Sequence, residues 1–367
     1  MTTDEKIKLI TRNLEETLTE EELKTLIDSG TPLKHYIGFE ISGKVHLGTG
    51  FASMLKIKDL QDAGVETTIL LADWHTWLNK KLDGTLETAR KMARDYFEEG
   101  MRAAALCVGA DPDKIEFVLG SELYEKKNLE FWATVVKVSK ATTLSRMMRS
   151  TTIMGRKEGE ISDAAMLIYP ALQSADIFEM GITLAHAGTD QRNVHVVARD
   201  AAKEVGFPKP VAIHHHLLQG LLKPSVWPIP EDNRDEAVMA MKMSKSKPDS
   251  AVFIHDTPEE IKRKVESAFA PEGETAYNPV LDWAKYLIFY NDGSSLTVKR
   301  DEKFGGDVTY SSYEDLKEDY AEKKLHPMDL KAAMVEWLVE KLAPAREYFE
   351  DPKRKAALEE IERLTAK

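Results

Sequence analysis

The feature that most constrains this chain is an alternation of short apolar runs with longer segments of helical character. Runs of this length, bounded by turn residues, are typical of buried strands. Strands separated by helices predict a Rossmann-like α/β fold with a doubly wound parallel sheet, which binds ligands at the carboxyl ends of its strands. The predicted strands are 35–41, 65–72, 115–119, 183–187 and 210–216, and the predicted helices are 49–63, 86–106 and the region 129–172.

The last third of the chain has a different texture. A capping box at Thr19–Glu22 opens a short helix near the beginning, but after Pro258 helices dominate, at 258–269, at 279–289 and from about 311 to the end. A short β-like patch lies near 296–310. We therefore expect a catalytic domain over 1–255, with a helical insertion at about 125–165, and a smaller, mainly helical C-terminal domain over 256–367.

Composition indicates a soluble protein of a reducing compartment. Hydrophobic residues make up 43% of the chain and charged residues 31%, as in globular proteins. Cys107 is the only cysteine, so no disulfide can form within the chain. The charged start of the sequence does not resemble a secretory signal, and no apolar run is long enough to span a membrane. We expect a cytoplasmic protein. The net charge of −12 means that a nucleic-acid partner would need a local basic face.

The first strand and turn, HYIGFEISGKVHLGTG (His35–Gly50), have the form of an anion site. A strand, a glycine turn and a helix place backbone N–H groups and the positive helix end at the binding edge of the sheet. His46 lies in this turn, where its imidazole can donate a hydrogen bond to a phosphate oxygen. Gly48 allows the backbone to approach closely. Read alone, His-x-Gly more often belongs to an ordinary turn than to an anion site.

A second motif lies about 200 residues later, in MKMSKSKPDS (Met241–Ser250). Three lysines and three serines without an apolar period predict a solvated cationic loop. Together, His46–Thr49 and Lys242–Ser246 resemble the two signature motifs of class I aminoacyl-tRNA synthetases, and the second matches at all five positions. The wider sequence resembles tyrosyl-tRNA synthetases of the archaeal and eukaryotic type. The matching pieces, between Tyr36 and Lys331, are YIGFEISG, LLADWHTWLN, IYPALQSADI, DQRNVH, KFGGDVT and LHPMDLK.

This resemblance implies a tyrosine–tRNA ligase. Such an enzyme activates L-tyrosine with ATP to tyrosyl-adenylate and pyrophosphate, and then transfers the tyrosyl group to the 3′ end of tRNA(Tyr). The chemistry needs positioning and charge neutralisation more than a covalent nucleophile. Mg²⁺ would bridge the phosphates. By resemblance, the catalytic residues are His46, Lys242 and Lys245, and the ATP-binding residues are Gly38, His46, Gly48, Thr49, Lys245 and Ser246. The family often has a second histidine where this chain has Thr49, whose hydroxyl can also donate.

The amino acid pocket has a pattern of its own. Tyr169, Gln173 and Asp176 share one face of a helix in an otherwise apolar stretch, so this face is predicted to border something buried. A solvent-facing stripe is the alternative, and Pro170 could kink the helix. By resemblance, Tyr36 and Asp176 would hold the phenol hydroxyl of tyrosine, and Tyr169, Gln173 and Gln191 its α-ammonium group.

Histidines outside these motifs have plainer interpretations. His75 follows the second strand and could line the pocket or belong to the core. His214, His215 and His216 are consecutive, so on a strand they point to alternating faces and cannot all ligate one ion. No cysteine or carboxylate cluster completes a zinc set, and we expect no metal site there. The resemblance places this segment near the adenine.

Local charge indicates a nucleic-acid partner. Between Phe131 and Lys157 there are six basic residues and no acidic one, which is a candidate phosphate-binding face. The alternative is a patch that pairs with acidic neighbours. By resemblance, this insertion forms a homodimer contact and meets the tRNA acceptor stem. The residues that match tRNA-reading positions are Arg149, Arg192, Phe304, His326 and Asp329, the last three suited to unstacked anticodon bases.

Two rival functions remain at this stage. A tryptophanyl-tRNA synthetase shares the architecture, but indole has no hydroxyl for Tyr36 and Asp176 to bind. A non-catalytic RNA-binding relative is the other, and the intact motifs around His46 and Lys245 argue against it.

The position of Lys245 in its motif generates a prediction. Lys245→Ala should slow tyrosine activation and leave tyrosine binding nearly unchanged, because the charge that Lys245 neutralises develops on the leaving pyrophosphate. The loss should be on the order of 2–4 kcal/mol of transition-state stabilisation. Pyrophosphate exchange gives the rate, and a tyrosine titration gives the affinity. A normal rate combined with weakened tyrosine binding would contradict the assignment.

Overall fold

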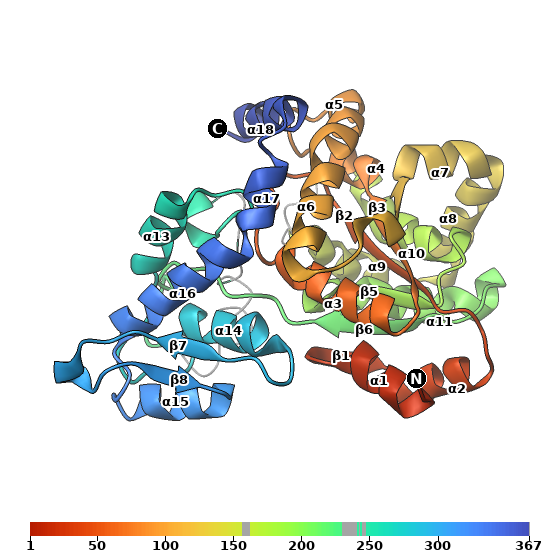
Figure 1. Cartoon of the computed structure of the whole chain (residues 1–367). Helices are drawn as coiled ribbons and strands as arrows, with labels where there is room; N and C mark the ends of the chain where they lie inside the picture. Colours follow the sequence, from red (N-terminus) through yellow and green to blue (C-terminus); the bar gives the residue numbers. More distant parts are fainter. Residues whose placement is uncertain (156–161, 230–240, 242, 244–246, 367) are drawn as a thin grey trace.

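The computed structural model describes residues 1–155, 162–229, 241, 243 and 247–366 (Figure 1). Lys242, Lys245 and Ser246 lie outside the described residues. The predicted α/β class is confirmed, because a central sheet has helices on both faces. Its strands are β1 (Leu14–Leu18), β2 (Lys34–Phe39), β3 (Glu66–Leu71), β4 (Ile115–Leu119), β5 (Leu184–Gly188) and β6 (Val211–His215). A separate hairpin contains β7 (Leu296–Val298) and β8 (Val308–Tyr310).

The six strands of the sheet run in the order β1-β6-β5-β2-β3-β4. All neighbours from β6 to β4 are parallel, as predicted. The prediction missed β1, which pairs antiparallel with β6 at the sheet edge. Its sequence, LEETL, carries little apolar signal, and its strand conformation depends on pairing with β6.

Helices of the N-terminal two thirds cover both faces of the sheet. Ile37 and Ile69 point to one face, where α3 and α6 pack, while Tyr36 and Leu70 point to the other, where α8, α10 and α11 pack. These alternating contacts are those of a doubly wound sheet. The helices are α1 (Thr3–Thr11), α2 (Glu20–Asp28), α3 (Phe51–Asp62), α4 (Asp73–Leu78), α5 (Leu86–Met92), α6 (Glu98–Val108), α7 (Gly120–Lys127), α8 (Leu129–Ala141), α9 (Leu144–Ser150), α10 (Tyr169–Glu179) and α11 (Arg192–Val205).

Two helix predictions need correction. The segment 86–106 is not one regular helix, because a π-helical turn at Ala93–Phe97 separates α5 from α6. That turn contains Tyr96, whose hydroxyl accepts a hydrogen bond from the Val45 N–H at 2.9 Å. Pro170 does not kink its helix, because α10 begins at Tyr169 and proline is tolerated in the first turn. The region 129–172 consists of α8, α9, 3₁₀ turns and the beginning of α10.

The C-terminal part is mainly helical, as expected. Of its helices, α16 and α15 pack against the small β7–β8 hairpin, and α17 and α18 return to lie beside α6 and α5 (Figure 1). One buried apolar cluster joins Phe51 and Met101 to Trp283 and Leu338. The boundary near residue 256 stays a prediction. The helices are α13 (Pro258–Glu266), α14 (Pro279–Tyr286), α15 (Tyr313–Ala321), α16 (Pro327–Lys341), α17 (Ala343–Tyr348) and α18 (Pro352–Thr365).

His216 ties three parts of the chain together just past the end of β6. Its Nδ1 lies 3.0 Å from Glu15 of β1, and its Nε2 lies 2.7 Å from Asp282 of α14. The ring stacks on Tyr286 at 3.8 Å between centroids. Burial alone would lower the pKa of His216, but the hydrogen bonds with Asp282 and Glu15 outweigh it and raise the pKa to about 9. An imidazolium between two carboxylates thus joins the sheet to the C-terminal helices.

This arrangement predicts a pH-dependent stability. The pKa of His216 is raised above the ordinary value near 6.5, so its contribution is complete below about pH 6.5 and is lost as pH rises through about 9. We expect the free energy of unfolding of the native chain to fall on the order of 2 kcal/mol more than that of His216→Gln across this interval. Urea denaturation at a series of pH values measures both. If the free energy of unfolding depended on pH in the same way for both proteins, His216 would not be a stabilising imidazolium.

Candidate active site

The turn that carries His46 is fixed by backbone pairing with a distant segment. The Leu47 N–H donates to the Val252 carbonyl at 3.0 Å, and the Ile254 N–H donates to the Val45 carbonyl at 3.1 Å. His46 and Phe253 therefore face each other in a short antiparallel bridge. Phe253 follows the second motif by a few residues in the sequence, so this pairing brings the segment after that motif to the turn of the first.

The His46 ring has a defined orientation. Its Nδ1 accepts hydrogen bonds from the backbone N–H groups of Gly48 and Thr49, at 3.1 and 3.2 Å. A neutral imidazole that accepts at Nδ1 carries its proton on Nε2. The Thr49 hydroxyl lies 3.1 Å from that Nε2, so Thr49 contacts the histidine as well as the turn. The local backbone thereby fixes His46 as an Nε2–H donor.

Met243 is the described residue inside the second motif, and it lies against the first. A methyl group added at Gly48 would stand 3.6 Å from the Met243 sulfur and 3.2 Å from the His46 ring. The Met243 N–H donates to the Leu218 carbonyl at 3.3 Å, and the Met241 carbonyl accepts from the Gly220 N–H at 2.6 Å. Met243 is thus anchored beside Gly48, and Met241 is anchored to Gly220.

A cavity of about 660 Å³ opens at the carboxyl ends of β2, β5 and β6. It has the location that parallel sheets use for ligands. The structure brings together in its lining most of the predicted site residues that it describes, from four separate segments of the chain. These are Tyr36, Gly38, His46, Gly48, Thr49, Tyr169, Gln173 and Gln191.

Asp176 lies fully buried beside this cavity. Its Oδ1 accepts a hydrogen bond from the Tyr124 hydroxyl at 2.9 Å, and its Oδ2 lies 3.5 Å from His75 Nε2. That second oxygen has no hydrogen-bond donor among the described residues. Burial raises the pKa of Asp176 well above the usual range, and a ligand hydroxyl that donates to the free oxygen would stabilise the ionised carboxylate.

Tyr36 is the second buried polar group at this end. Its side chain is 1% exposed, and burial, followed by the charge of Asp176, raises its pKa well above the ordinary value. Tyr36 therefore stays a neutral hydroxyl that can donate and accept. A methyl group at Gly38 would stand 2.7 Å from the Tyr36 hydroxyl, so this glycine leaves the phenol its space.

Three further polar side chains line the cavity. The Tyr169 hydroxyl donates to Glu40 at 2.7 Å, and the Gln191 amide donates to the Ile153 carbonyl at 3.0 Å. Gln173 Nε2 lies 3.5 Å from Gln191 Oε1. Carbonyl, carboxylate and phenol oxygens in this grouping are acceptors, which suits an ammonium group.

Sequence analysis missed three residues that contact the predicted site residues or each other beside this cavity, namely Glu40, Asn79 and Tyr124. Glu40 follows directly after β2 and is held by Asn79, whose amide donates to it at 2.8 Å. A charged residue at the carboxyl end of an apolar strand was a usable signal for Glu40. Tyr124 carried no such signal, because only the packing of α7 against α10 brings its hydroxyl to Asp176.

His75 is both buried and at the cavity. It is 2% exposed, lines the cavity, and packs edge-on against Tyr169 with 4.6 Å between ring centroids. Burial lowers the pKa of His75 to about 3, so the ring is neutral.

The three consecutive histidines diverge, as strand geometry predicts. His214 contacts His195, His215 contacts His186, and His216 contacts Asp282. Within the part of the chain that is described, no group of three or more His, Cys, Asp or Glu side chains is placed to hold a metal ion. His215 and His216 do line the cavity.

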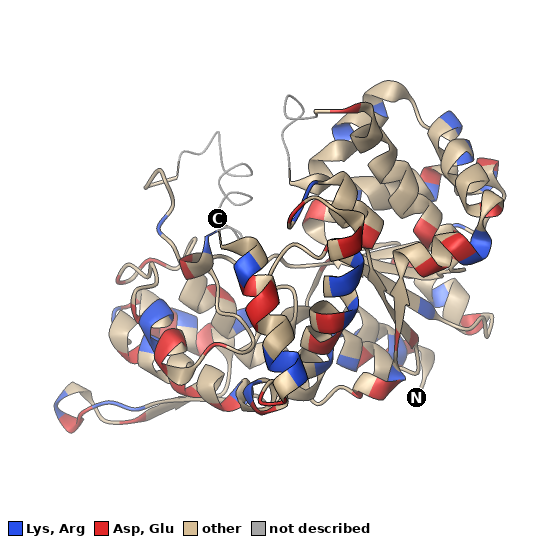
Figure 2. Cartoon of the chain, turned by 90° about the horizontal axis from the view of Figure 1, so that it is seen from above, with Lys and Arg blue, Asp and Glu red and all other residues tan. Residues whose placement is uncertain are grey.

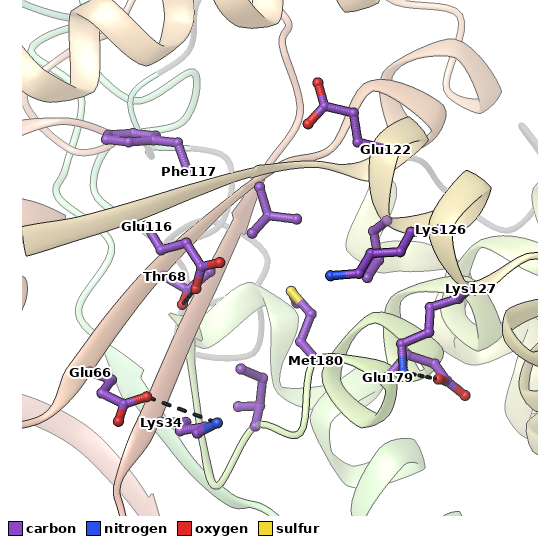
Figure 3. A pocket seen from close by; sticks show the side chains of 13 residues that line it. Lys34, Glu66, Thr68, Glu116, Phe117, Glu122, Lys126, Lys127, Glu179 and Met180 are labelled. Carbon is purple, nitrogen blue, oxygen red and sulfur yellow. Dashed lines mark hydrogen bonds and ion pairs between the residues drawn. The ribbon is translucent and has the colours of Figure 1, made fainter.

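A second cavity, of about 440 Å³, contains none of the predicted site residues (Figure 3). It lies near the beginnings of β2 and β3, where Lys34 and Glu66 approach to 4.0 Å. Lys127 and Glu179 form a closer pair at 3.3 Å. Because this cavity contains none of the predicted site residues and the first contains eight of them, the first cavity is the candidate active site.

The predicted RNA-contacting residues lie elsewhere on the surface. Arg149 is on α9 and Arg192 opens α11, where its guanidinium bonds Glu16 of β1 at 2.8 Å. Phe304 is 64% exposed beside the β7–β8 hairpin, and His326 and Asp329 lie at the start of α16. Basic and acidic segments are interspersed over most of the chain (Figure 2), whereas 131–150 contains no acid.

Comparison with known proteins identifies the family to which the chain belongs. The family model described as tRNA synthetases class I (W and Y) matches residues 28–343, so the chain belongs to this family. A tyrosine–tRNA ligase of Thermococcus onnurineus is 57% identical over 356 residues, covering 94% of each chain. The crystal structure of a Pyrococcus horikoshii tyrosyl-tRNA synthetase complexed with L-tyrosine superposes with a TM-score of 0.94 at 52% identity, covering 98% of this chain and 100% of that one. A tryptophanyl-tRNA synthetase of Aeropyrum pernix K1 reaches 0.67 at 20% identity, covering 93% and 84%, and shares the fold alone.

Proposed function

We propose that the chain is a tyrosine–tRNA ligase that activates L-tyrosine with ATP and transfers the tyrosyl group to tRNA(Tyr). The observation that carries this proposal is the pair Tyr36 and Asp176, both buried at the cavity, with one Asp176 oxygen lacking a donor among the described residues. A phenol hydroxyl can donate to Asp176 and accept from Tyr36 at once, whereas an indole N–H can only donate. The high identity to tyrosine–tRNA ligases supports the same substrate.

The proposed pose places tyrosine across the cavity. The phenol hydroxyl meets Tyr36 and Asp176, and the α-ammonium group meets Tyr169, Gln173 and Gln191, whose oxygens accept hydrogen bonds. The carboxylate then points toward the turn of Gly48. ATP occupies the end lined by Gly38, His46 and Thr49, so that the α-phosphate lies beside the carboxylate that attacks it.

His46 and the second motif stabilise the charge that develops on the departing pyrophosphate. His46 would donate through Nε2, the nitrogen that the bonds to Nδ1 leave protonated, by exchanging the Thr49 hydroxyl for a phosphate oxygen. Lys242, Lys245 and Ser246 lie outside the described residues, and the anchoring of Met243 beside Gly48 supports their approach to the same phosphates. Mg²⁺ would be bound by phosphate oxygens, because the described residues offer no cluster of acidic side chains to enclose it.

We further propose that tRNA binds along the insertion and the C-terminal domain, residues 256–367. Arg149 and Arg192 would contact the acceptor end, with Arg192 exchanging Glu16 for phosphate. Phe304, His326 and Asp329 would read the anticodon, since an exposed ring stacks bases and the other two bond base edges.

A homodimer would form through the insertion. Leu129, Val136 and Leu144 are 78%, 58% and 67% exposed, and apolar groups gathered this way indicate an interface. None of the described helices has the length and apolar character to cross a bilayer. The proposed location is the cytoplasm, where tRNA is charged for translation.

Amino acid selectivity gives the central test. Pyrophosphate exchange with each of the twenty amino acids should show tyrosine as the substrate. Asp176→Ala should weaken tyrosine use and reduce the preference for tyrosine over phenylalanine. The interval between Gly48 and Lys242 is filled by the sheet and a modest insertion, with no room for a separate hydrolytic domain. Discrimination between the two amino acids must therefore come from the cavity that contains Asp176. An unpaired buried group costs about 1–3 kcal/mol, so the tyrosine-to-phenylalanine ratio of kcat/KM should fall roughly 5- to 150-fold.

Asp176→Asn, which preserves the shape, should lie between the native chain and Asp176→Ala. The matched control is Asp200→Ala, a surface carboxylate on α11 that contacts Arg146. If the ratio is unchanged in both Asp176 variants, this residue does not read the hydroxyl and the tyrosine assignment loses its physical support.

The dimer has a matched pair of variants, because Val136 and Val226 are each 58% exposed but only Val136 lies in the insertion. Sedimentation equilibrium at micromolar concentration should give twice the 41.4 kDa chain mass. Val136→Glu should weaken association at least about tenfold, and Val226→Glu should leave it unchanged. A native chain that sediments as a monomer would exclude the proposed dimer.

A further inference from the structure

Three buried imidazoles form a continuous hydrogen-bonded chain across the sheet. His35 Nε2 lies 3.0 Å from His186 Nδ1, and His186 Nε2 lies 2.8 Å from His215 Nδ1. The residues belong to the adjacent strands β2, β5 and β6, and the pairing registers place their side chains on the same face. The chain runs diagonally, from the beginning of β2 to the end of β6 at the candidate active site.

Burial lowers the pKa of all three imidazoles, to about 3 for His35, to about 4 for His215 and well below the ordinary value for His186. Each ring is therefore neutral near pH 7 and carries a single N–H. Because each contact needs one donor and one acceptor, only two arrangements satisfy both contacts. Either all three protons are on Nε2, or all three are on Nδ1.

The far end of the chain selects between them. His35 Nδ1 is buried and has no hydrogen-bond partner among the described residues. With protons on Nδ1, His35 would bury an N–H without an acceptor, and orphaned N–H groups are rarer in proteins than unused acceptor lone pairs. With protons on Nε2, the unpaired atom is only a lone pair. His215 then presents an N–H at the other end of the chain.

A second histidine pair, on the opposite face of the sheet, also needs one donor and one acceptor in each contact. In this pair the protons lie on Nδ1. Glu16 lies 3.0 Å from His214 Nδ1, so that nitrogen donates, and His214 Nε2 accepts from His195 Nδ1 at 3.0 Å. His195 Nε2 is left buried and without a partner among the described residues, again as a lone pair. Both of these rings are therefore Nδ1–H tautomers, which makes them an internal reference.

The active-site end of the first chain is at His215. His215 and Gly188 line the large cavity, and a methyl group at Gly188 would stand 3.5 Å from His215 Nε2. The Asp190 carboxylate would be 2.9 Å from the same point, and its charge favours a proton on the nearby Nε2. The cavity end and the buried end thus favour the same tautomer.

We propose that the chain His35–His186–His215 fixes His215 as an Nε2–H donor to an acceptor atom on the nucleoside part of bound ATP. His215 contacts the nucleotide, and His35 and His186 are positioning residues that act through it. The assignment of the ligand rests on the proposed function, whereas the tautomers are a property of the free protein. The two can therefore fail separately.

The first experiment determines the tautomers in the free protein by two-bond ¹H–¹⁵N correlation on full-length chain labelled with [¹⁵N]histidine at pH 7.5. His35, His186 and His215 should show the Nε2–H pattern, and His195 and His214 the Nδ1–H pattern, with assignments from single substitutions. Nδ1–H tautomers at His186 and His215 would overturn the proposal whatever the enzyme does. On addition of ATP, the His215 Nε2–H resonance should shift while that of His195 stays in place.

The second experiment is kinetic. His186→Leu removes the partner of His215 Nδ1, whereas His186→Gln can accept from His35 and donate to His215. In pyrophosphate exchange, the leucine variant should raise the KM for ATP about three- to tenfold, with kcat and the KM for tyrosine nearly unchanged, and the glutamine variant should restore it. His195→Leu, which breaks the reference pair, should leave the KM for ATP unchanged.

Equal ATP KM values in the native chain and both His186 variants would overturn the role of the chain in nucleotide binding. A purely structural role would instead lower the stability of His186→Leu and His195→Leu alike without a selective effect on ATP, and this also counts against the proposal. If the native chain shows no tyrosine-dependent exchange at all, the proposed function fails, and the tautomer measurement still decides the state of the three imidazoles.

Discussion

The short antiparallel bridge between His46 and Phe253 is the contact on which the site depends. It joins two segments about 200 residues apart, one in the first turn of the sheet and the other just past the cationic loop. Backbone hydrogen bonds of this kind do not depend on side-chain identity, so they fix geometry while the side chains remain available for chemistry. Tyr96 adds a third support, because its hydroxyl satisfies the Val45 N–H from beneath the turn.

Near this bridge, the protein buries polar atoms at positions where apolar atoms would be more stabilising. Asp176 Oδ2 and both nitrogens of His75 are buried without hydrogen-bond partners among the described residues. A buried polar group that lacks a partner is costly, and such groups are expected mainly where a ligand completes them. The free-energy cost of the unpaired Asp176 oxygen also gives the proposed preference for tyrosine over phenylalanine. A ligand without a hydroxyl leaves that oxygen without a donor.

The two faces of the sheet use histidine differently. Ordinary strand alternation at β6 sends His214 toward Glu16 and α11, and sends His215 toward His186 and the cavity. Both sets end in a buried nitrogen without a partner among the described residues, but a carboxylate, that of Glu16, anchors only the set that contains His214. In a chain of neutral imidazoles, the tautomer of the ring at one end therefore fixes the tautomer of the ring at the other end, with no change in charge. His216, one residue further, has the opposite character, as a protonated ring between Glu15 and Asp282.

The sequence by itself determined the fold class and identified eight of the residues that line the candidate active site. Apolar runs give parallel strands because both faces of such a sheet are buried, and the spacing of Tyr169, Gln173 and Asp176 places them on one helix. Local sequence could not reveal β1, whose strand conformation depends on pairing with β6, or the π turn that aims Tyr96. Nor could it show that Tyr124 reaches Asp176, that Arg192 is held by Glu16, or that His35, His186 and His215 meet. Those contacts join residues from about 30 to 180 positions apart, and only the tertiary packing of strands and helices decides which distant side chains share a hydrogen bond.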